Sequence, residues 1–281
     1  MQNALANRNL QFMKLKQTID ACRLPLLSLL LVLLGSRRAV AEPRPEAVAA
    51  FNSYAATVET RLTRQHRSHS TFLAPDSFAG DGEARLRAGE LIIQQIAPPI
   101  PNPPGALLRH WRGAAFVQGA HAADFERLLR DFNAYPQRFA PQVLRAQSSG
   151  QGDHFQATMR VRQKHVITVV MDTAYDVDLG RLDETARYSA SRSTHIYEID
   201  SPGTPRERPL SPQEEHGFLW RLNTYWTYEE RDGGLYIQIE SISLSRSIPT
   251  GLGWAVRPFV ESVPRESLEF TLRSASNAIR R

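Results

Sequence analysis

The feature that most restricts the fold is a long succession of strand-like segments with no helix-like segment between them. Six such segments lie between residues 142 and 245. Residues 155–161 alternate apolar and polar side chains, the period of a half-buried strand, and 166–177 are rich in β-branched residues. Parallel sheets need a helical crossover between strands, so this order excludes a doubly wound α/β fold and favours an antiparallel sheet.

Helical patterns flank this succession on both sides. A strand over 107–117 and a helix over 121–132 precede it, and a helix over 264–279 closes the chain with one apolar face. Asp232-Gly233-Gly234 joins the last two strands as a hairpin turn. The pattern predicts an α+β fold in which a curved antiparallel sheet wraps around a long C-terminal helix.

The first 41 residues have the pattern of a secretory signal peptide. A basic stretch precedes the apolar run 24–35, and Ala39-Val40-Ala41 is a small-residue cleavage pattern. We therefore expect export to the periplasm or medium, with cleavage before Glu42. Arg37 and Arg38 follow the apolar run and resist translocation, so an uncleaved membrane anchor is the alternative.

The charge of the chain is concentrated in this leader. It holds six basic residues against one acidic residue, which leaves 28 of each sign in the other 240 residues. A balanced body gives no support for nucleic-acid binding. The single cysteine, Cys22, also lies in the leader, so the mature chain has no cysteine for a disulfide, a thiolate metal site or a nucleophile.

Sequence signatures of cofactor and metal sites are missing. The chain has no GxxxxGK[ST], GxGxxG, GxSxG or HExxH motif. His66 and His69 are close in sequence, but two histidines alone do not make a zinc site. We therefore expect neither a metal nor a cofactor.

Residues 42–105 are predicted to form a separate N-terminal region. Residues 46–66 carry an apolar seam at helical spacing, which indicates either a helix packed on its own domain, the reading we favour, or one that contacts a membrane surface or partner. The segment 97–105 holds five prolines in nine residues and predicts a stiff linker. The predicted domains are thus 1–41, 42–105 and 106–281.

The order of elements resembles the START-like superfamily of polyketide cyclase/dehydrase and lipid-transport proteins (SRPBCC, or helix-grip, proteins), including uncharacterised exported bacterial members. The segments that carry the resemblance are HWRGAAFVQGAHAADFERLLRDF (110–132), VITVVMDTAYDV (166–177), FLWRLNTYWTYEERDGGLYIQIESISLSRSIPTG (218–251) and PFVESVPRESLEFTL (258–272). The resemblance implies a helix-grip fold over 106–281, with a cavity between sheet and last helix that holds a lipid or other apolar molecule. It implies no catalytic motif, because fold does not determine activity.

Aromatic residues concentrate in 218–228 and nominate a ligand site. Trp220, Trp226 and Tyr228 share one face if the strand is regular, and indicate either a cavity wall or core packing against the last helix. Trp254 follows two glycines in a segment that is either a gate over the cavity or a plain turn.

Polar residues on otherwise apolar strands nominate further site residues. The candidates for orienting a ligand headgroup are Arg192, Asn223 and Arg246.

A second hypothesis gives the chain catalytic activity. Asp172 or Glu240, with His195, would transfer protons in a cyclase, dehydratase or hydrolase, provided that they meet in one cavity. The apolar phase of the last strand changes near Glu240, which suggests a β-bulge and leaves open which face Glu240 occupies.

The favoured function is binding of a hydrophobic or amphipathic small molecule without transforming it. The sequence does not indicate an oligomeric state.

Overall fold

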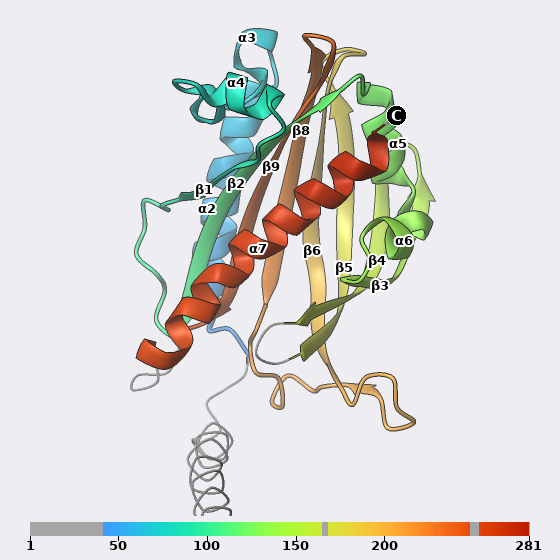
Figure 1. Ribbon diagram of the computed structural model, residues 1–281. Helices are drawn as coiled ribbons and strands as arrows, with labels where there is room; N and C mark the ends of the chain where they lie inside the picture. The colour runs from blue at the N-terminus through green and yellow to red at the C-terminus, as the bar shows by residue number, and fades with distance from the viewer. Residues whose placement is uncertain (1–41, 165–167, 248–252, 281) are drawn as a thin grey trace, which may run out of the picture. The chain divides into compact units, whose positions relative to one another are not determined.

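The computed structural model describes residues 42–164, 168–247 and 253–280, and Figure 1 shows their arrangement. Residues Ala41–Arg281 group into one compact unit. The predicted leader, 1–41, lies outside the described residues.

The described chain contains one large antiparallel sheet, which confirms the fold class expected from the sequence. Its order is β1-β2-β9-β8-β6-β5-β4-β3, and β7 pairs with β6. The strands are β1 (Ile92–Ile96), β2 (Ala106–Gln118), β3 (Val143–Gln151), β4 (His154–Lys164), β5 (Thr168–Arg181), β6 (Ala186–Asp200), β7 (Arg208–Pro209), β8 (Arg221–Arg231) and β9 (Gly234–Arg246). The predicted hairpin turn between β8 and β9 is present, with positive φ at Asp232 and Gly233.

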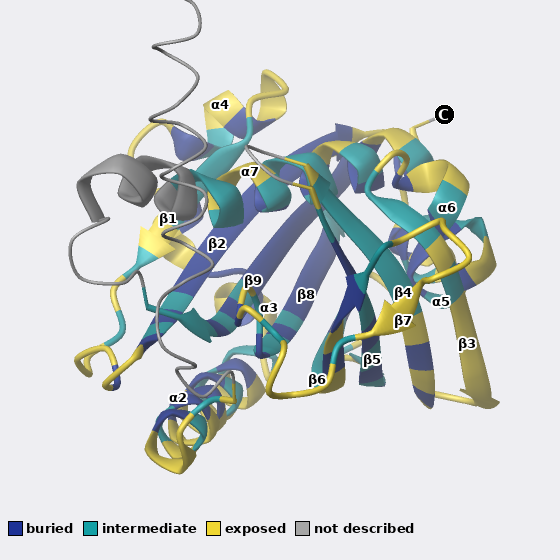
Figure 2. Ribbon diagram, turned by 90° about the horizontal axis from the view of Figure 1, so that it is seen from below, coloured by how far each residue is buried: buried dark blue, intermediate teal, exposed yellow. Residues whose placement is uncertain are grey.

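Helices cover both faces of this sheet. They are α2 (Pro45–Gln65), α3 (His69–Phe72), α4 (Gly82–Arg87), α5 (Ala122–Arg130), α6 (Tyr135–Arg138) and α7 (Gly253–Ile279), with 3-10 turns at Pro75–Phe78 and Phe132–Ala134. Helix α7 crosses the concave face diagonally, and α5 and α6 lie beside its C-terminal end, whereas α2 runs along the opposite, convex face (Figures 1 and 2). Among the described helices none is long and apolar enough to span a membrane.

Helix α7 is longer than predicted, because it begins at Gly253 and continues through Pro258 and Pro264. The prediction placed Pro264 in the first turn, where proline is most easily accommodated. The contact of α7 with the sheet depends on Gly113 of β2, where a Cβ atom would lie 2.5 Å from Leu272 Cδ1. The missing side chain therefore lets helix and sheet approach closely.

The predicted boundary at residue 105 does not separate two structural units. Helix α2 buries Phe51, Val58 and Leu62 against the convex face, and β1 adds an edge strand to the same sheet. The proline-rich segment 97–105 joins β1 to β2 within this unit. The apolar seam of 46–66 therefore packs on its own domain, as favoured, and this packing covers the apolar side that a membrane contact would use.

Strand β9 has no bulge near Glu240, contrary to the prediction. Its register with β2 and with β8 is continuous from Gly234 to Arg246. The apolar phase changes because a different face is covered along the strand. Ile237 and Ile239 pack under α5 and α7, whereas Ile242 and Leu244 pack under α2. The change in apolar phase that the sequence shows near Glu240 is therefore caused by a change in which helices pack on β9, not by a bulge.

Candidate functional site

The sheet register defines the residues of the concave face. Ser241 of β9 pairs with Thr224 of β8, and Thr224 pairs with Ser191 of β6. This row continues to Trp111 on one side and Val177 on the other, both of which belong to the core under α7. Because directly paired residues point to the same side of a sheet, the three hydroxyl residues face the side that α7 crosses.

A second row lies one step farther from the hairpin. It contains Ser243 of β9, Leu222 of β8 and Ser193 of β6. Ser193 Oγ accepts a hydrogen bond from the backbone N–H of Leu222 at 2.9 Å, which locks the two strands together here. The two rows present five hydroxyl side chains and one apolar side chain, that of Leu222, on one face.

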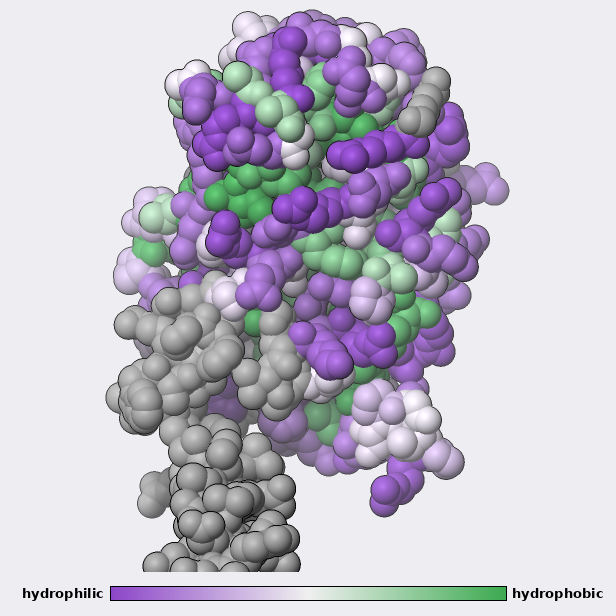
Figure 3. Space-filling view, in the orientation of Figure 1, coloured by the Kyte–Doolittle hydropathy of each residue, from purple (hydrophilic) through white to green (hydrophobic). Residues whose placement is uncertain are grey.

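These inward-facing residues are only half-buried. The half-buried positions on this part of the face are Met159, Val161, Ser191, Ser193, Leu222, Thr224, Ser241 and Ser243. Helix α7 leaves them accessible because its diagonal path covers the hairpin end of the sheet and not the lower parts of β8, β6 and β4 (Figure 1). We call this set of eight residues the open section. Met171, Thr173 and Tyr175 of β5 face the same side but are buried. On the face that α7 crosses, Figure 3 shows apolar side chains reaching the surface among hydrophilic ones.

The opposite end of the concave face is a packed core. Trp226 and Tyr228 are 6% and 0% exposed, and the Phe125 ring of α5 stands edge-on to both at centroid distances of 5.1 and 4.8 Å. These two predicted ligand contacts therefore contribute to core packing, the second of the two interpretations that the sequence allowed. The structure closes this half of the expected cavity with side chains.

Two polar atoms in this core have no hydrogen-bond partner among the described residues. They are Trp111 Nε1 and the Tyr228 hydroxyl. Buried polar groups are normally paired. Trp111 stands in the same row as Ser241, so its indole N–H belongs to the border between core and open section.

The other predicted aromatic contacts lie elsewhere. Trp220 precedes β8 and packs on the convex side with Ala106 and Leu244, so it does not share a face with Trp226. The strand alternation does not extend to Trp220 because β8 begins only at Arg221. Trp254 falls in the first turn of α7, and its side chain is outside the described residues.

The polar candidates for headgroup contacts are on the convex face. Arg192 pairs with Glu59 of α2 at 2.7 Å and with Asp178. Asn223 donates to the Tyr225 hydroxyl at 3.1 Å. Arg246 pairs in register with Ala106, a residue of the α2-side cluster. None of the three belongs to the open section.

Glu240 is the centre of a buried charge cluster beneath α2. Its Oε2 accepts from His110 Nε2 at 2.8 Å and from Arg61, and its Oε1 accepts from Arg112 Nε at 3.1 Å. Tyr54 of α2 completes the cluster by a 2.9 Å hydrogen bond to His110 Nδ1. Burial opposes ionisation, but the His110 hydrogen bond and the charges of Arg112 and Arg61 outweigh it and lower the pKa of Glu240 to about 2.

The proposed catalytic group is not assembled. Asp172 accepts two hydrogen bonds from Arg160 at 2.6 and 2.7 Å, and His195 is exposed and stacked on Tyr197. Glu240 of β9 pairs through Tyr225 with Ala190 of β6, five residues from His195, which at about 3.3 Å per residue is roughly 16 Å along the strand and too far for proton transfer.

The serines of the open section were missed by sequence reasoning, although a signal for two of them exists. Ser241 and Ser243 alternate with Ile242 and Leu244 where the apolar phase of β9 changes. At that point along β9, α5 and α7 no longer cover the concave face, and α2 begins to cover the convex face. Knowing that α2 packs on the convex face would have been needed to interpret it.

Two surface cavities lie outside the open section. One of about 300 Å³ adjoins the β8–β9 hairpin, where His121 Nδ1 is 2.7 Å from Glu230 Oε1. Another of about 140 Å³ lies beside the C-terminal end of α7. In the parts of the chain that the structure describes, no group of three or more His, Cys, Asp or Glu side chains could hold a metal ion.

Comparisons with known proteins find similar solved structures at low sequence identity. No family model matches it, and no curated protein matches it in sequence. A STAR-related lipid transfer protein from Xanthomonas axonopodis aligns at 18% identity over 67% of this chain and 99% of its own, with a TM-score of 0.43.

Two further solved structures show the same level of similarity. The Zhui aromatase/cyclase from Streptomyces sp. R1128 aligns at 13% identity over 61% of this chain and 93% of its own, with a TM-score of 0.42. A START superfamily protein from Mycobacterium smegmatis aligns at 11% identity over 62% and 96%, with a TM-score of 0.36. Such values carry no argument about ligand or activity, and the fold assignment rests on the topology described above.

Proposed function

We propose that this chain binds an amphipathic or hydrophobic small molecule, lipid-like in character, on the open section of its concave face. The observation that carries the proposal is the half-burial of eight residues that face the same side as the core. Residues that face the interior of a well-packed core are normally buried from solvent. Here a ligand would supply the missing apolar contacts to Leu222, Met159 and Val161.

The chemistry of the open section indicates the kind of ligand. Serine and threonine hydroxyls donate and accept hydrogen bonds without charge, and Leu222, Met159 and Val161 place alkyl and thioether groups on the same face. A molecule with an apolar body and a few neutral oxygen functions matches this surface. The proposal concerns binding without transformation, because none of the eight side chains titrates in a range useful for proton transfer.

The experiment compares two hydroxyl-to-arginine substitutions. Ser191→Arg places a charge in the open section, and Thr158→Arg places the same charge on an exposed position of β4 that faces the convex side. Binding of oleate and of 1-anilinonaphthalene-8-sulfonate is measured by fluorescence titration. We expect Ser191→Arg to weaken binding at least tenfold and Thr158→Arg to leave it within twofold. Equal binding by both variants and the unaltered chain would contradict the proposal.

Native mass spectrometry of the protein from its own host provides the complementary measurement. We expect a co-purified molecule of lipid-like mass that is absent from the Ser191→Arg variant. Repeatedly empty protein, together with no affinity for fatty acids, phospholipids or sterols, would refute the proposed function.

We further propose that the chain is exported and that residues 1–41 are removed. The order of basic, apolar and small residues in the leader supports this. N-terminal sequencing of exported protein should begin at Glu42. A start at Met1 or Met13 in membrane-bound protein would instead indicate an uncleaved anchor.

A further inference from the structure

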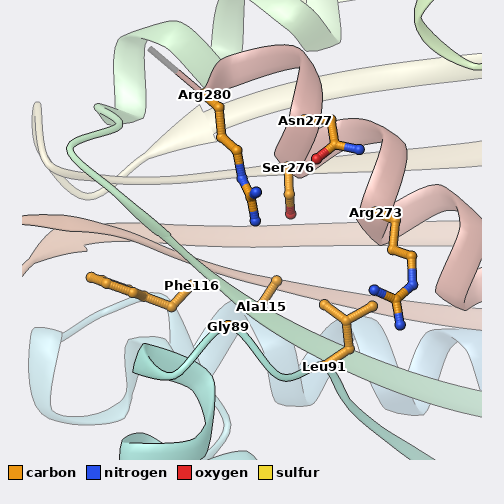
Figure 4. Close-up of a pocket in the computed structure, with 8 residues that line it drawn as sticks. All are labelled: Gly89, Leu91, Ala115, Phe116, Arg273, Ser276, Asn277 and Arg280. Carbon is orange, nitrogen blue, oxygen red and sulfur yellow. The ribbon is translucent and has the colours of Figure 1, made fainter.

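A second site lies at the free edge of the sheet, away from the open section. Strand β1 pairs with β2 only as far as Ala114, so it does not cover the outer edge of β2 beyond that residue. The C-terminal end of α7 passes over this uncovered edge, and a cavity of about 140 Å³ remains between them (Figure 4). A water molecule needs only about 10–15 Å³ in this measure, so the cavity has room for a group much larger than water.

One face of α7 supplies the polar side of the cavity. Arg273, Ser276 and Asn277 have the spacing i, i+3, i+4, which places them in one stripe along the helix, and Arg280 directly follows the last helical residue, Ile279. Figure 4 shows the guanidinium groups of Arg273 and Arg280 and the hydroxyl of Ser276 directed toward the same side, opposite Leu91 and Ala115. The Phe116 ring points aside and packs against Tyr236. Two positive groups and a hydroxyl therefore converge over an apolar floor.

The hydroxyl of Ser276 is an unpartnered buried group. Ser276 is 5% exposed, and its Oγ has no hydrogen-bond partner among the described residues. A buried hydroxyl without a partner is unfavourable unless a bound molecule or water satisfies it. An acceptor atom in the cavity would do so.

The arginines have capacity for an anion. Arg273 donates hydrogen bonds from Nε and Nη2 to Glu269 Oε1, at 3.0 and 2.8 Å. Its Nη1 takes no part in these two bonds and can donate to an anion. Within the described chain Arg280 forms no ion pair, and no carboxylate lines the cavity. Guanidinium groups match the oxygens of phosphate in geometry and charge.

We propose that this cavity binds a phosphate group, either of a free ion or of a lipid headgroup. Arg280 and Arg273 each donate to its oxygens, and Ser276 donates a third hydrogen bond from the buried side. The apolar floor then contacts whatever part of the molecule carries the phosphate. This site is separate from the open section, and neither proposal depends on the other.

The test uses the full chain with inorganic phosphate as the probe, measured by isothermal titration calorimetry at constant ionic strength of 0.15 M, where loose surface attraction is screened. We expect Arg273→Ala/Arg280→Ala to weaken binding at least tenfold. Arg265→Ala, an exposed arginine on the same helix but outside the cavity, is the control and should bind like the unaltered chain. Equal binding by the double variant and the unaltered chain would overturn the proposal, as would equal weakening by the control.

Two further variants separate a built site from a general charge effect. Arg280→Lys keeps the charge but loses the planar fork, so we expect weaker phosphate binding with unchanged thermal stability. Ser276→Ala removes the unpartnered hydroxyl, so we expect a phosphate-free protein at least as stable as before, with severalfold weaker phosphate binding. Unchanged affinity in both variants would contradict the site.

Vesicles distinguish the two sources of phosphate. Phosphatidylcholine vesicles with and without phosphatidic acid are sedimented with the chain and with the double variant. Sedimentation that needs phosphatidic acid and both arginines identifies a headgroup, whereas calorimetric binding of phosphate without such sedimentation identifies a soluble ion. Absence of binding in both arms refutes the proposal.

Discussion

Replacing Glu240 with glutamine tests whether the buried charge cluster holds α2 on the convex face. Glu240 is 4% exposed and accepts hydrogen bonds from His110, Arg61 and Arg112. Glutamine keeps the shape of the side chain but removes its charge, so two arginines lose their common counter-ion. Breaking one partner of a buried ion pair typically costs about 3–5 kcal/mol.

The pKa of Glu240 gives an independent magnitude. Its pKa falls from the ordinary 4.5 to about 2 in the folded chain, because His110 and the two arginines outweigh the effect of burial. At 1.36 kcal/mol per unit, the ionised group contributes about 3 kcal/mol to the free energy of unfolding at neutral pH. This contribution is present in full above pH 4.5 and is lost as pH falls through 2. It amounts to about 1.5 kcal/mol at pH 3.

The assay is urea unfolding of the unaltered chain and of Glu240→Gln at pH 7 and pH 3. We expect Glu240→Gln to lower the free energy of unfolding by about 3 kcal/mol at pH 7 and by roughly half as much at pH 3. Glu269→Gln is the control, because its ion pair with Arg273 is largely exposed and is worth at most about 1 kcal/mol. A difference between the unaltered chain and Glu240→Gln that does not change with pH would refute the reasoning.

Three further predictions concern the packing of the two layers. Gly113→Val should destabilise the fold by about 1–3 kcal/mol in thermal melts, since its Cβ would meet Leu272; an unchanged melting temperature would contradict the close approach. Burial, followed by the charge of Arg61, lowers the pKa of His66 to about 4, so stability should fall as pH drops from 6.5 to 4, by up to about 2 kcal/mol at pH 5. His66→Gln should flatten that dependence in urea titrations, and an unaltered pH slope would count against it. Tyr228→Phe removes an unpartnered hydroxyl and should be neutral or stabilising in urea unfolding, whereas a loss above about 1 kcal/mol would reveal a partner for that hydroxyl.

Most elements were predictable because their patterns are local. The alternation in 155–161 and the hairpin signal at Asp232-Gly233-Gly234 depend on a few neighbouring residues, and β4 and the β8–β9 turn appear where expected. Element boundaries were less accurate. Helix α7 begins eleven residues before the predicted start, because Pro264 fits a first turn as well as an internal position in a helix that the sheet supports.

The candidate site was predicted in kind but not in position. Trp226 and Tyr228 were correctly placed on one face, yet they are buried in the core with residues of α5 and α7. Asp172, His195 and Glu240 were grouped because each interrupts an apolar strand. An interruption shows only that a polar side chain occupies the strand, and a partner elsewhere in the chain, such as Arg160 for Asp172, can account for it.

From its sequence alone this chain was committed to an antiparallel sheet with a terminal helix, since strand period and turn chemistry are properties of adjacent residues. Which layer covers each face was decided only by the tertiary structure. Apolar residues at every second position indicate that one side of a strand is buried, but they do not indicate which element buries it. The sequence therefore did not reveal that α2 covers the convex face. For the same reason it did not reveal that the serines of β9 face a part of the concave side that α7 leaves open.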